Sequence, residues 1–371
     1  MLVIIGNGFD LRCGLETDYI KYFKNRYNKQ VFKSFISSFE NYYESKSLSA
    51  FKDFFQKFVD EIFIEITIWD MVFIKEQVTN KKSGWYYIEN IIKDYLVNDK
   101  LSLNSIRNKL NLDKNLELFY HLLSAFFQSK SLTFSQLQYY EWLLKQLNIL
   151  EKDFAKYVKY QLETHVGYLN DANRVFNQLC KLCSSRTKEI SVISFNYTKP
   201  DLFYEGSIFN KSVSITNLTN VHGTIFDNVI FGIDEKDISD KKYISPSDLK
   251  YAFTKTARKF NNFEKESDFQ LNKNEEAILF FGHSLNQQDY SYFQSIFDYY
   301  SIYSSDIKII FVYFNFDKTK KIKAEMVDSA IKLLKEYGST MSNIGNGNNL
   351  LHKMLLENRL LIKELTDYNY L

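Results

Sequence analysis

Four short segments of this chain combine glycines with side chains that bind ligands or move protons. They are Gly6–Asp10, Ser194–Thr198, Val221–Gly223 and Gly282–Leu285. Glycine N–H groups at a strand end, backed by the N-terminus of a helix, form a site for phosphate. A histidine, with an ordinary pKa near ~6.5, exchanges a proton at neutral pH, and an asparagine amide both donates and accepts hydrogen bonds. Together these residue types indicate a nucleotide-binding site.

The first segment follows the apolar run Leu2–Ile5, which we expect to form a short buried strand, and helix-competent sequence begins near Tyr19. This arrangement predicts a nucleotide-binding α/β sheet whose first strand is central. The dinucleotide fingerprint is incomplete, because its glycines stand at positions 6, 8 and 14 and no acidic residue follows a second strand. An ordinary Rossmann dehydrogenase is therefore disfavoured, and a plain tight turn is the structural alternative.

Several apolar runs have the length and composition of buried parallel strands. They are Leu2–Ile5, Ile190–Phe195, Val229–Phe231, Ala277–Phe281 and Ile307–Tyr313. Between the first two runs, apolar residues recur at helical spacing, as at positions 143, 147, 150 and 154. We therefore predict a doubly wound, mostly parallel sheet from residues 1–23 and 186–371, with a helical insertion at 24–185.

All four polar segments come just after such a strand, or in the loop that leads on from one. In an open α/β sheet, ligands bind outside the carboxyl ends of the strands. Four segments in this register are thus expected to converge on one crevice.

Composition limits the classes of function without choosing one. The 371 residues carry a net charge of +2 and an isoelectric point near 8.1, which argues neither for nor against nucleic acid. Three cysteines are too few for a disulfide framework, which favours a reducing compartment. No apolar run reaches the ~18 residues of a membrane span, and Met1 leads directly into the first strand. We expect a soluble, cytoplasmic protein.

Two further features have competing interpretations. The helical segment 245–275 carries Lys250, Lys255, Arg258 and Lys259, which predict a solvated helix face or, alternatively, a lid over an anionic ligand. Cys180 and Cys183 have redox or metal spacing, but no second pair accompanies them, so packing is the better interpretation. No histidine spacing indicates a metal site.

The four segments together resemble the AbiH family, bacterial proteins of abortive phage infection. The resemblance is carried by Gly-Asn-Gly-Phe-Asp-x3-Gly-Leu-x-Thr-x-Tyr from residue 6, Ser-Phe-Asn-Tyr-Thr, His-Gly, and Gly-His-Ser-Leu-x3-Asp ending at residue 289. The same order is similar to a diverged sirtuin-type NAD-binding fold. In that comparison Asn196 matches the ribose-binding asparagine, His222 the catalytic histidine, and Gly282 with Ser284 the nucleotide-loop pair.

Departures from the sirtuin pattern limit what the resemblance implies. Asp10 stands in place of a serine, Thr198 in place of an aspartate and His283 in place of a threonine. The zinc-ribbon cysteines of the deacetylases are absent from the sequence, so deacetylation of proteins is not implied. What the resemblance does imply is a nicotinamide-ribose site, as in sirtuin-like NAD hydrolases of bacterial defence.

The implied activity is cleavage of the nicotinamide N-glycosidic bond of NAD, without a metal. Asn196 would hold ribose hydroxyls or the attacking water, His222 would accept a proton, and Asp10 would stabilise positive charge on the sugar. The remaining residues expected to contact the nucleotide are Gly6, Asn7, Gly8, Phe9, Thr17, Tyr197, Gly223, Gly282, His283, Ser284 and Asp289.

Structural roles compete with these assignments. Asp10, Asn196 and Asp289 are residue types that cap helices, His222 could simply bond to the backbone, and aromatic residues such as Phe9 and Tyr197 commonly belong to a core. A nucleotide sensor without turnover and a nucleic-acid-acting effector are the competing functions. The resemblance further implies a phage trigger of unknown identity and, by family analogy, a homo-oligomer.

Overall fold

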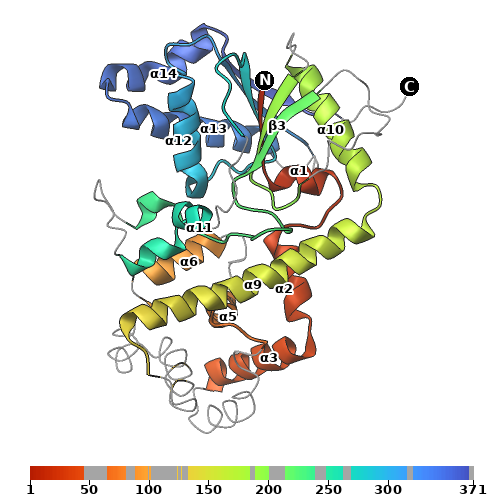
Figure 1. Cartoon of the computed structure of the whole chain (residues 1–371), viewed down its shortest axis with the longest axis vertical. Coiled ribbons are helices and arrows are strands. Elements are labelled where there is room, and N and C mark those ends of the chain that lie inside the picture. The colour runs from red at the N-terminus through yellow and green to blue at the C-terminus, as the bar shows by residue number, and fades with distance from the viewer. Residues whose placement is uncertain are drawn as a thin grey trace. The chain divides into compact units, whose positions relative to one another are not determined.

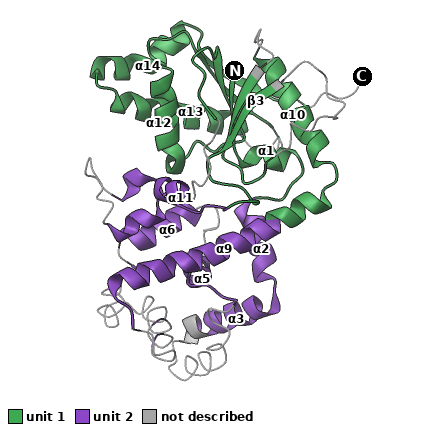
Figure 2. Ribbon diagram, in the orientation of Figure 1, with its two compact units in different colours: residues 1–17, 158–227, 263–371 green, residues 18–157, 228–262 purple. Residues whose placement is uncertain are grey.

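A computed structural model of the chain provides the fold (Figure 1). It describes residues 1–45, 65–80, 88–98, 100–101, 123, 127, 133–183, 189–199, 214–238, 248–261, 269–315 and 321–366. The predicted lid segment 245–275 lies partly outside these residues. The chain divides into two compact units (Figure 2). Unit 1 contains residues 1–17, 158–227 and 263–371, and unit 2 contains residues 18–157 and 228–262.

The centre of unit 1 is a six-stranded sheet in which each described pairing is parallel. Its strands lie in the order β3-β2-β1-β4-β5-β6, so the order changes direction between β1 and β4. Their bounds are β1 Leu2–Ile5, β2 Glu189–Ser194, β3 Ser214–Asn220, β4 Ala277–Phe281, β5 Lys308–Tyr313 and β6 Leu360–Glu364. A parallel sheet with a central first strand is therefore confirmed.

Helices cover both faces of this sheet. Successive residues of a strand point to opposite sides, so each face contributes its own side chains to a core. Leu2 and Ile4 face a core formed with α12 Tyr290–Tyr299, α13 Ile322–Thr340 and α14 Ile344–Leu356. Val3 and Ile5 face the opposite core. That core is formed with α1 Asn7–Arg12 and α10 Tyr168–Leu182, and Cys180 and Cys183 pack against it. All four residues of β1 are fully buried, so this strand is the centre of the unit.

One strand prediction is wrong, and two of the observed strands were not predicted. The apolar run Val229–Phe231 is not a strand, and only Ile233 forms an isolated bridge nearby, with Thr254. Phe231 is instead buried in unit 2, where its N–H donates to Glu151. The unpredicted strands are β3, which is rich in serine, threonine and asparagine, and β6.

Unit 2 is helical in its described part. Its helices are α2 Tyr19–Tyr27, α3 Gln30–Ser45, α5 Ile68–Asn80, α6 Ile88–Val97, most of α9 Gln136–Thr164, and α11 Lys255–Asn261. The short α1 precedes the helix expected near Tyr19. The predicted boundaries at 24–185 and 245–275 differ from those of the compact units, since α10 belongs with the sheet.

Two cations of the basic segment are buried, which corrects the expectation of a solvated face. Lys255 is 3% exposed and pairs with Glu89 at 2.9 Å, and Arg258 is 7% exposed and pairs with Glu151. Arg258 also donates to the carbonyl of Phe231 at 3.0 Å. These ion pairs link α11 to α6 and α9 within unit 2. None of the described helices combines the length and the apolar composition that a membrane span requires.

Candidate active site

Four adjacent strands of unit 1 lead into the four polar segments. Gly6–Asp10 follows β1, Ser194–Thr198 begins at the last residue of β2, Val221–Gly223 follows β3 and Gly282–Leu285 follows β4. These strands are parallel and neighbours in the order β3-β2-β1-β4, so their carboxyl ends share one edge of the sheet. That edge is where open α/β sheets bind ligands.

Asp10 lies in α1 and is a buried carboxylate with neutral hydrogen-bond donors. Its side chain accepts from the hydroxyl of Thr198, at 2.9 Å and 2.7 Å to its two oxygens, and from the hydroxyl of Tyr168 at 2.8 Å. Burial raises the pKa of Asp10 from 3.8 to about 6, and these hydrogen bonds offset only part of the effect. This carboxyl group therefore changes its charge close to neutral pH.

Asn196 follows β2 and is 2% exposed. Its main chain is fixed by the Asn220 amide, which donates to the carbonyls of Asn196 and Thr198 at 2.8 Å each. The Asn196 side chain favours the ionised form of Asp10 and so lowers its pKa. Within the described part of the chain, however, neither its amide nitrogen nor its oxygen makes a hydrogen bond of normal geometry. A buried amide in this state suits a ligand that supplies hydrogen bonds.

His222 and His283 lie on either side of one carboxylate. Nε2 of His222 is 2.8 Å from Oδ1 of Asp289, and Nε2 of His283 is 3.3 Å from Oδ2 of the same residue. All three side chains are buried. The ring of Phe195 contacts both imidazoles, with centroids at 5.3 Å and 4.6 Å. The site thus contains a histidine that is paired with a carboxylate, an arrangement that supports proton transfer.

The glycines of the first segment allow close packing of the main chain. The N–H of Gly6 donates to the carbonyl of Phe281 at 3.0 Å, and the N–H of Gly8 donates to the carbonyl of Gly282 at 2.8 Å. A Cβ at Gly8 would lie 2.7 Å from the Cα of Gly282. Both amides that were expected to hold phosphate therefore have main-chain partners in this structure.

The other residues of the first segment divide between the site and the core. Asn7 is half-buried, and its side-chain oxygen accepts from the hydroxyl of Thr17 at 2.6 Å. Phe9 is fully buried, with ring centroids 4.8 Å from Phe176 and 6.4 Å from Phe281. Phe9 is thus a core residue, and Asn7 with Thr17 forms a polar pair beside the turn.

The remaining predicted contacts lie in the loops after β2, β3 and β4. Tyr197 is half-buried, and its ring centroid is 6.3 Å from that of His222. Gly223 follows His222 with a φ of 77°, a backbone conformation that favours glycine. Ser284 is exposed to solvent.

Two residues that contact the site were not predicted from the sequence. Tyr168 donates to Asp10 from α10, and Asn220 fixes the segment after β2 from the end of β3. Tyr168 stands 158 positions from Asp10 in the chain, so no local pattern indicated this contact. A strand prediction for Ser214–Asn220 would have placed Asn220 beside Ser194, at the end of β2 that leads to Asn196.

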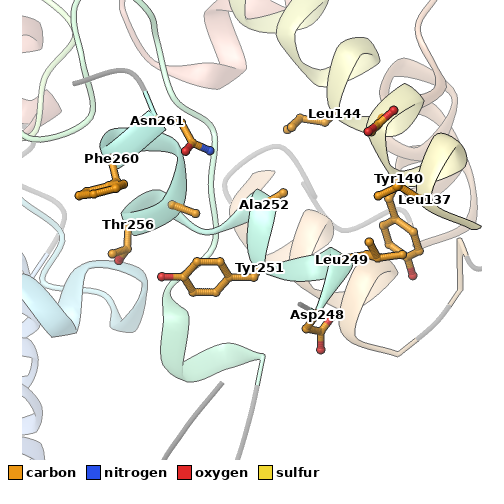
Figure 3. A pocket seen from close by; sticks show the side chains of 12 residues that line it. Leu137, Tyr140, Leu144, Asp248, Leu249, Tyr251, Ala252, Thr256, Phe260 and Asn261 are labelled. Carbon is orange, nitrogen blue, oxygen red and sulfur yellow. The ribbon is translucent and has the colours of Figure 1, made fainter. Parts of the chain in front are cut away.

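Unit 2 contains a separate pocket of about 600 Å³ that includes none of the predicted site residues (Figure 3). It is lined by Leu137, Tyr140, Glu141, Leu144, Asp248, Leu249, Tyr251, Ala252, Thr256, Ala257, Phe260 and Asn261. Its lining lacks a histidine and has no cluster of ionisable groups comparable to that of unit 1. Among the described residues of both units, no group of three or more His, Cys, Asp and Glu side chains has metal-binding geometry.

Fold and site define this protein as an α/β protein with a parallel sheet and a buried Asp, Asn and His cluster at the carboxyl edge of that sheet. The sequence matches the family model described as "Bacteriophage abortive infection AbiH" over residues 2–313. The chain therefore belongs to the AbiH family, which implies a role in bacteriophage abortive infection. Comparison with curated proteins gives no match, and neither does comparison with solved structures.

Proposed function

We propose that this protein hydrolyses the nicotinamide N-glycosidic bond of NAD as its action in phage defence. In the proposed step, a water oxygen attacks C1′ of the ribose while the bond from C1′ to nicotinamide breaks. Nicotinamide leaves as a neutral molecule with the bonding electron pair, and a proton of the water passes to His222. The other product is ADP-ribose. This leaving group needs no protonation, so the site requires positioning, a stabilising charge and a base.

Each of three residues has a role in this step. The ionised carboxylate of Asp10 stabilises the oxocarbenium character that develops on the ribose. The Asn196 amide binds ribose hydroxyls or the attacking water. The pairing of His222 with Asp289 suits a proton acceptor. The observation that carries the proposal is that Asp10, Asn196 and His222 follow three adjacent strands at one sheet edge.

The strand order supports a nucleotide as the ligand. An order of 3-2-1-4-5-6 is that of Rossmann-type sheets, in which dinucleotides bind where the order reverses. In unit 1 this point lies between β1 and β4, which lead into α1 with Asp10 and into the loop with His283. We therefore propose a diverged, sirtuin-like form of that fold, acting in the cytoplasm in response to a phage-derived trigger.

Nucleotide binding without turnover is the second candidate. It is favoured by the hydrogen bonds of Asp10 to Thr198 and Tyr168, which hold the carboxylate in place as a structural residue would be held. In this case NAD or ADP-ribose would act as a signal that the protein retains.

The test is NAD turnover followed by mass spectrometry. Wild type, Asn196→Ala and His222→Ala are compared, with His352→Ala as the matched control because His352 is exposed on α14. We expect nicotinamide and ADP-ribose from wild type and from the control, and at least a hundredfold loss of rate in the other two. Circular dichroism verifies folding of each variant. Retention of NAD without products would favour the sensor. If the protein showed no turnover and no binding of NAD, both candidates would be refuted.

A further inference from the structure

The loop after β4 is held in an unusual main-chain conformation. Gly282 has a φ of 69°, and Leu285 has a φ of 57°, which is uncommon for a residue with a side chain. A Cβ at Gly282 would lie 2.4 Å from the main-chain nitrogen of Phe9, so the loop packs tightly against the start of α1. Left-handed conformations of this kind persist where the surrounding structure determines them. The imidazole of His283 is therefore carried on a constrained segment.

This conformation determines which nitrogen of His283 carries a proton. The N–H of Leu285 donates to Nδ1 of His283 at 2.9 Å. A ring nitrogen that accepts a hydrogen bond has no proton, so neutral His283 must carry its proton on Nε2. Nε2 lies 3.3 Å from Oδ2 of Asp289, which is buried. His283 is thus a fixed donor toward that carboxylate, and it lacks the free Nε2 lone pair that a metal ligand needs.

The second oxygen of Asp289 is thereby directed to His222. Oδ1 of Asp289 lies 2.8 Å from Nε2 of His222. The charge of a carboxylate at that distance favours a proton on Nε2, although the contact lies outside normal hydrogen-bond angles, and Nδ1 is then the basic nitrogen of the ring. The other titratable groups with described ring contacts to His222 are Tyr197 and Tyr292, at centroid distances of 6.3 Å and 6.2 Å.

We propose that Asp289 and His283 are positioning residues that set the tautomer of His222, so that Nδ1 of His222 is the atom that accepts the proton. Asp289 acts on His222 directly, and His283 acts by holding the Asp289 carboxylate. This role replaces the nucleotide contacts that the sequence suggested for both residues. Its catalytic consequence rests on the proposed NAD hydrolysis, whereas the protonation pattern does not.

The test is NMR of the full-length protein labelled with ¹⁵N in its histidine rings. The chain has five histidines, so few signals arise, and His222→Gln and His283→Gln assign two of them. In the neutral form of each ring, we expect His283 and His222 to carry the proton on Nε2. A proton on Nδ1 of neutral His283, or on Nδ1 alone of His222, would overturn the proposal in the unmodified protein.

Asp289→Asn adds a test of cause. It should leave Nδ1 of His283 unprotonated, because Leu285 is unchanged, while His222 loses its preference for a proton on Nε2. An unchanged His222 spectrum would contradict the positioning role. In the NAD assay we expect kcat to fall at least tenfold with KM within twofold, and His352→Ala to match wild type. The ring spectra decide this inference, and the presence of turnover in wild type decides the proposed function.

Discussion

Each unit of the molecule contains a buried aspartate, and the two aspartates differ in their partners. In unit 2, Asp70 is fully buried and receives two hydrogen bonds from the guanidinium of Arg26, at 2.8 Å and 2.7 Å. Thr67 donates to it through both its N–H and its hydroxyl at 2.8 Å. In unit 1, Asp10 is 1% exposed and accepts from two hydroxyl groups, and none of the described interactions pairs it with a cation.

The difference separates a structural carboxylate from a candidate functional one. A buried carboxylate that is paired with a buried cation must keep that partner, because removing one member leaves an uncompensated buried charge. Burial without a cation raises the pKa of Asp10, because its hydrogen bonds offset only part of the desolvation, and groups with shifted pKa values concentrate at functional sites. Asp70 therefore links α2 and α5 of unit 2 through Arg26, whereas Asp10 is a candidate for the functional role proposed above.

The largest expected effect comes from removing the charge of Asp70. Asp70→Asn leaves the buried guanidinium of Arg26 with Asp153 alone as its carboxylate partner, at 2.6 Å. We expect the free energy of unfolding to fall by about 3 kcal/mol or more, measured by urea denaturation. Asp171→Asn is the control, because Asp171 pairs with a half-exposed Arg174 and should change stability by less than about 0.5 kcal/mol. If both variants lost the same free energy of unfolding, the buried pair of Asp70 would be no more important than an exposed one.

Asp10→Asn should change stability in a way that depends on pH. The folded state holds the Asp10 proton more tightly than the unfolded state, since its pKa rises from 3.8 to about 6. The associated stability is present below pH 4 and is lost as pH rises through about 6. A neutral amide escapes this loss, so from pH 4 to pH 8 the variant should gain up to about 3 kcal/mol relative to wild type.

Urea denaturation of wild type and Asp10→Asn at both pH values measures this gain. A stability difference that is the same at pH 4 and pH 8 would mean that Asp10 titrates like an exposed carboxylate. The comparison with Asp70 would then no longer distinguish function from structure. NAD turnover by Asp10→Asn should fall even where its stability rises, as expected of a residue kept for activity.

A smaller effect is expected from Gly282→Ala. The added methyl group would clash with the main-chain nitrogen of Phe9, and alanine is strained at a φ of 69°. We therefore expect the free energy of unfolding, measured by thermal denaturation, to fall by about 1–3 kcal/mol. Gly167→Ala is the matched control, since its φ is −83° and a Cβ there would come no closer than 3.6 Å to a neighbouring atom, an oxygen of the Asp171 side chain. If Gly282→Ala were as stable as this control, the loop that carries His283 would be less constrained than we infer.

Continuous apolar runs made four of the six strands predictable. Leu2–Ile5 and Ala277–Phe281 were found with their observed bounds, because strands buried on both faces have no polar alternation. Ser214–Asn220 lies at the edge of the sheet, where polar side chains are tolerated, and it gave no such signal. Val229–Phe231 has the same composition as a buried strand, but its burial comes from helical packing in unit 2.

The site was predictable in its segments and unpredictable in its contacts. Glycines, His222 and Asn196 stood out because of their types and their places after strands. The partners of Asp10 did not, because Tyr168 and Thr198 are 158 and 188 positions away in the chain. The pairing of His222 with Asp289 also depends on the order of β3 and β4 in the sheet, which no local pattern determines.

The central position of β1 also governs how the protein is made. Leu2 pairs with Ser191 on one side and with Ile278 on the other. At roughly 5–20 residues per second, the ribosome takes about 14 to 55 seconds to reach residue 278 after residue 2. Until then the first strand lacks one neighbour, and the loop with His283 and Asp289 has not been made. A chain that ends before residue 289 would therefore lack the pairing of His222 with Asp289, and the candidate site could not assemble in it.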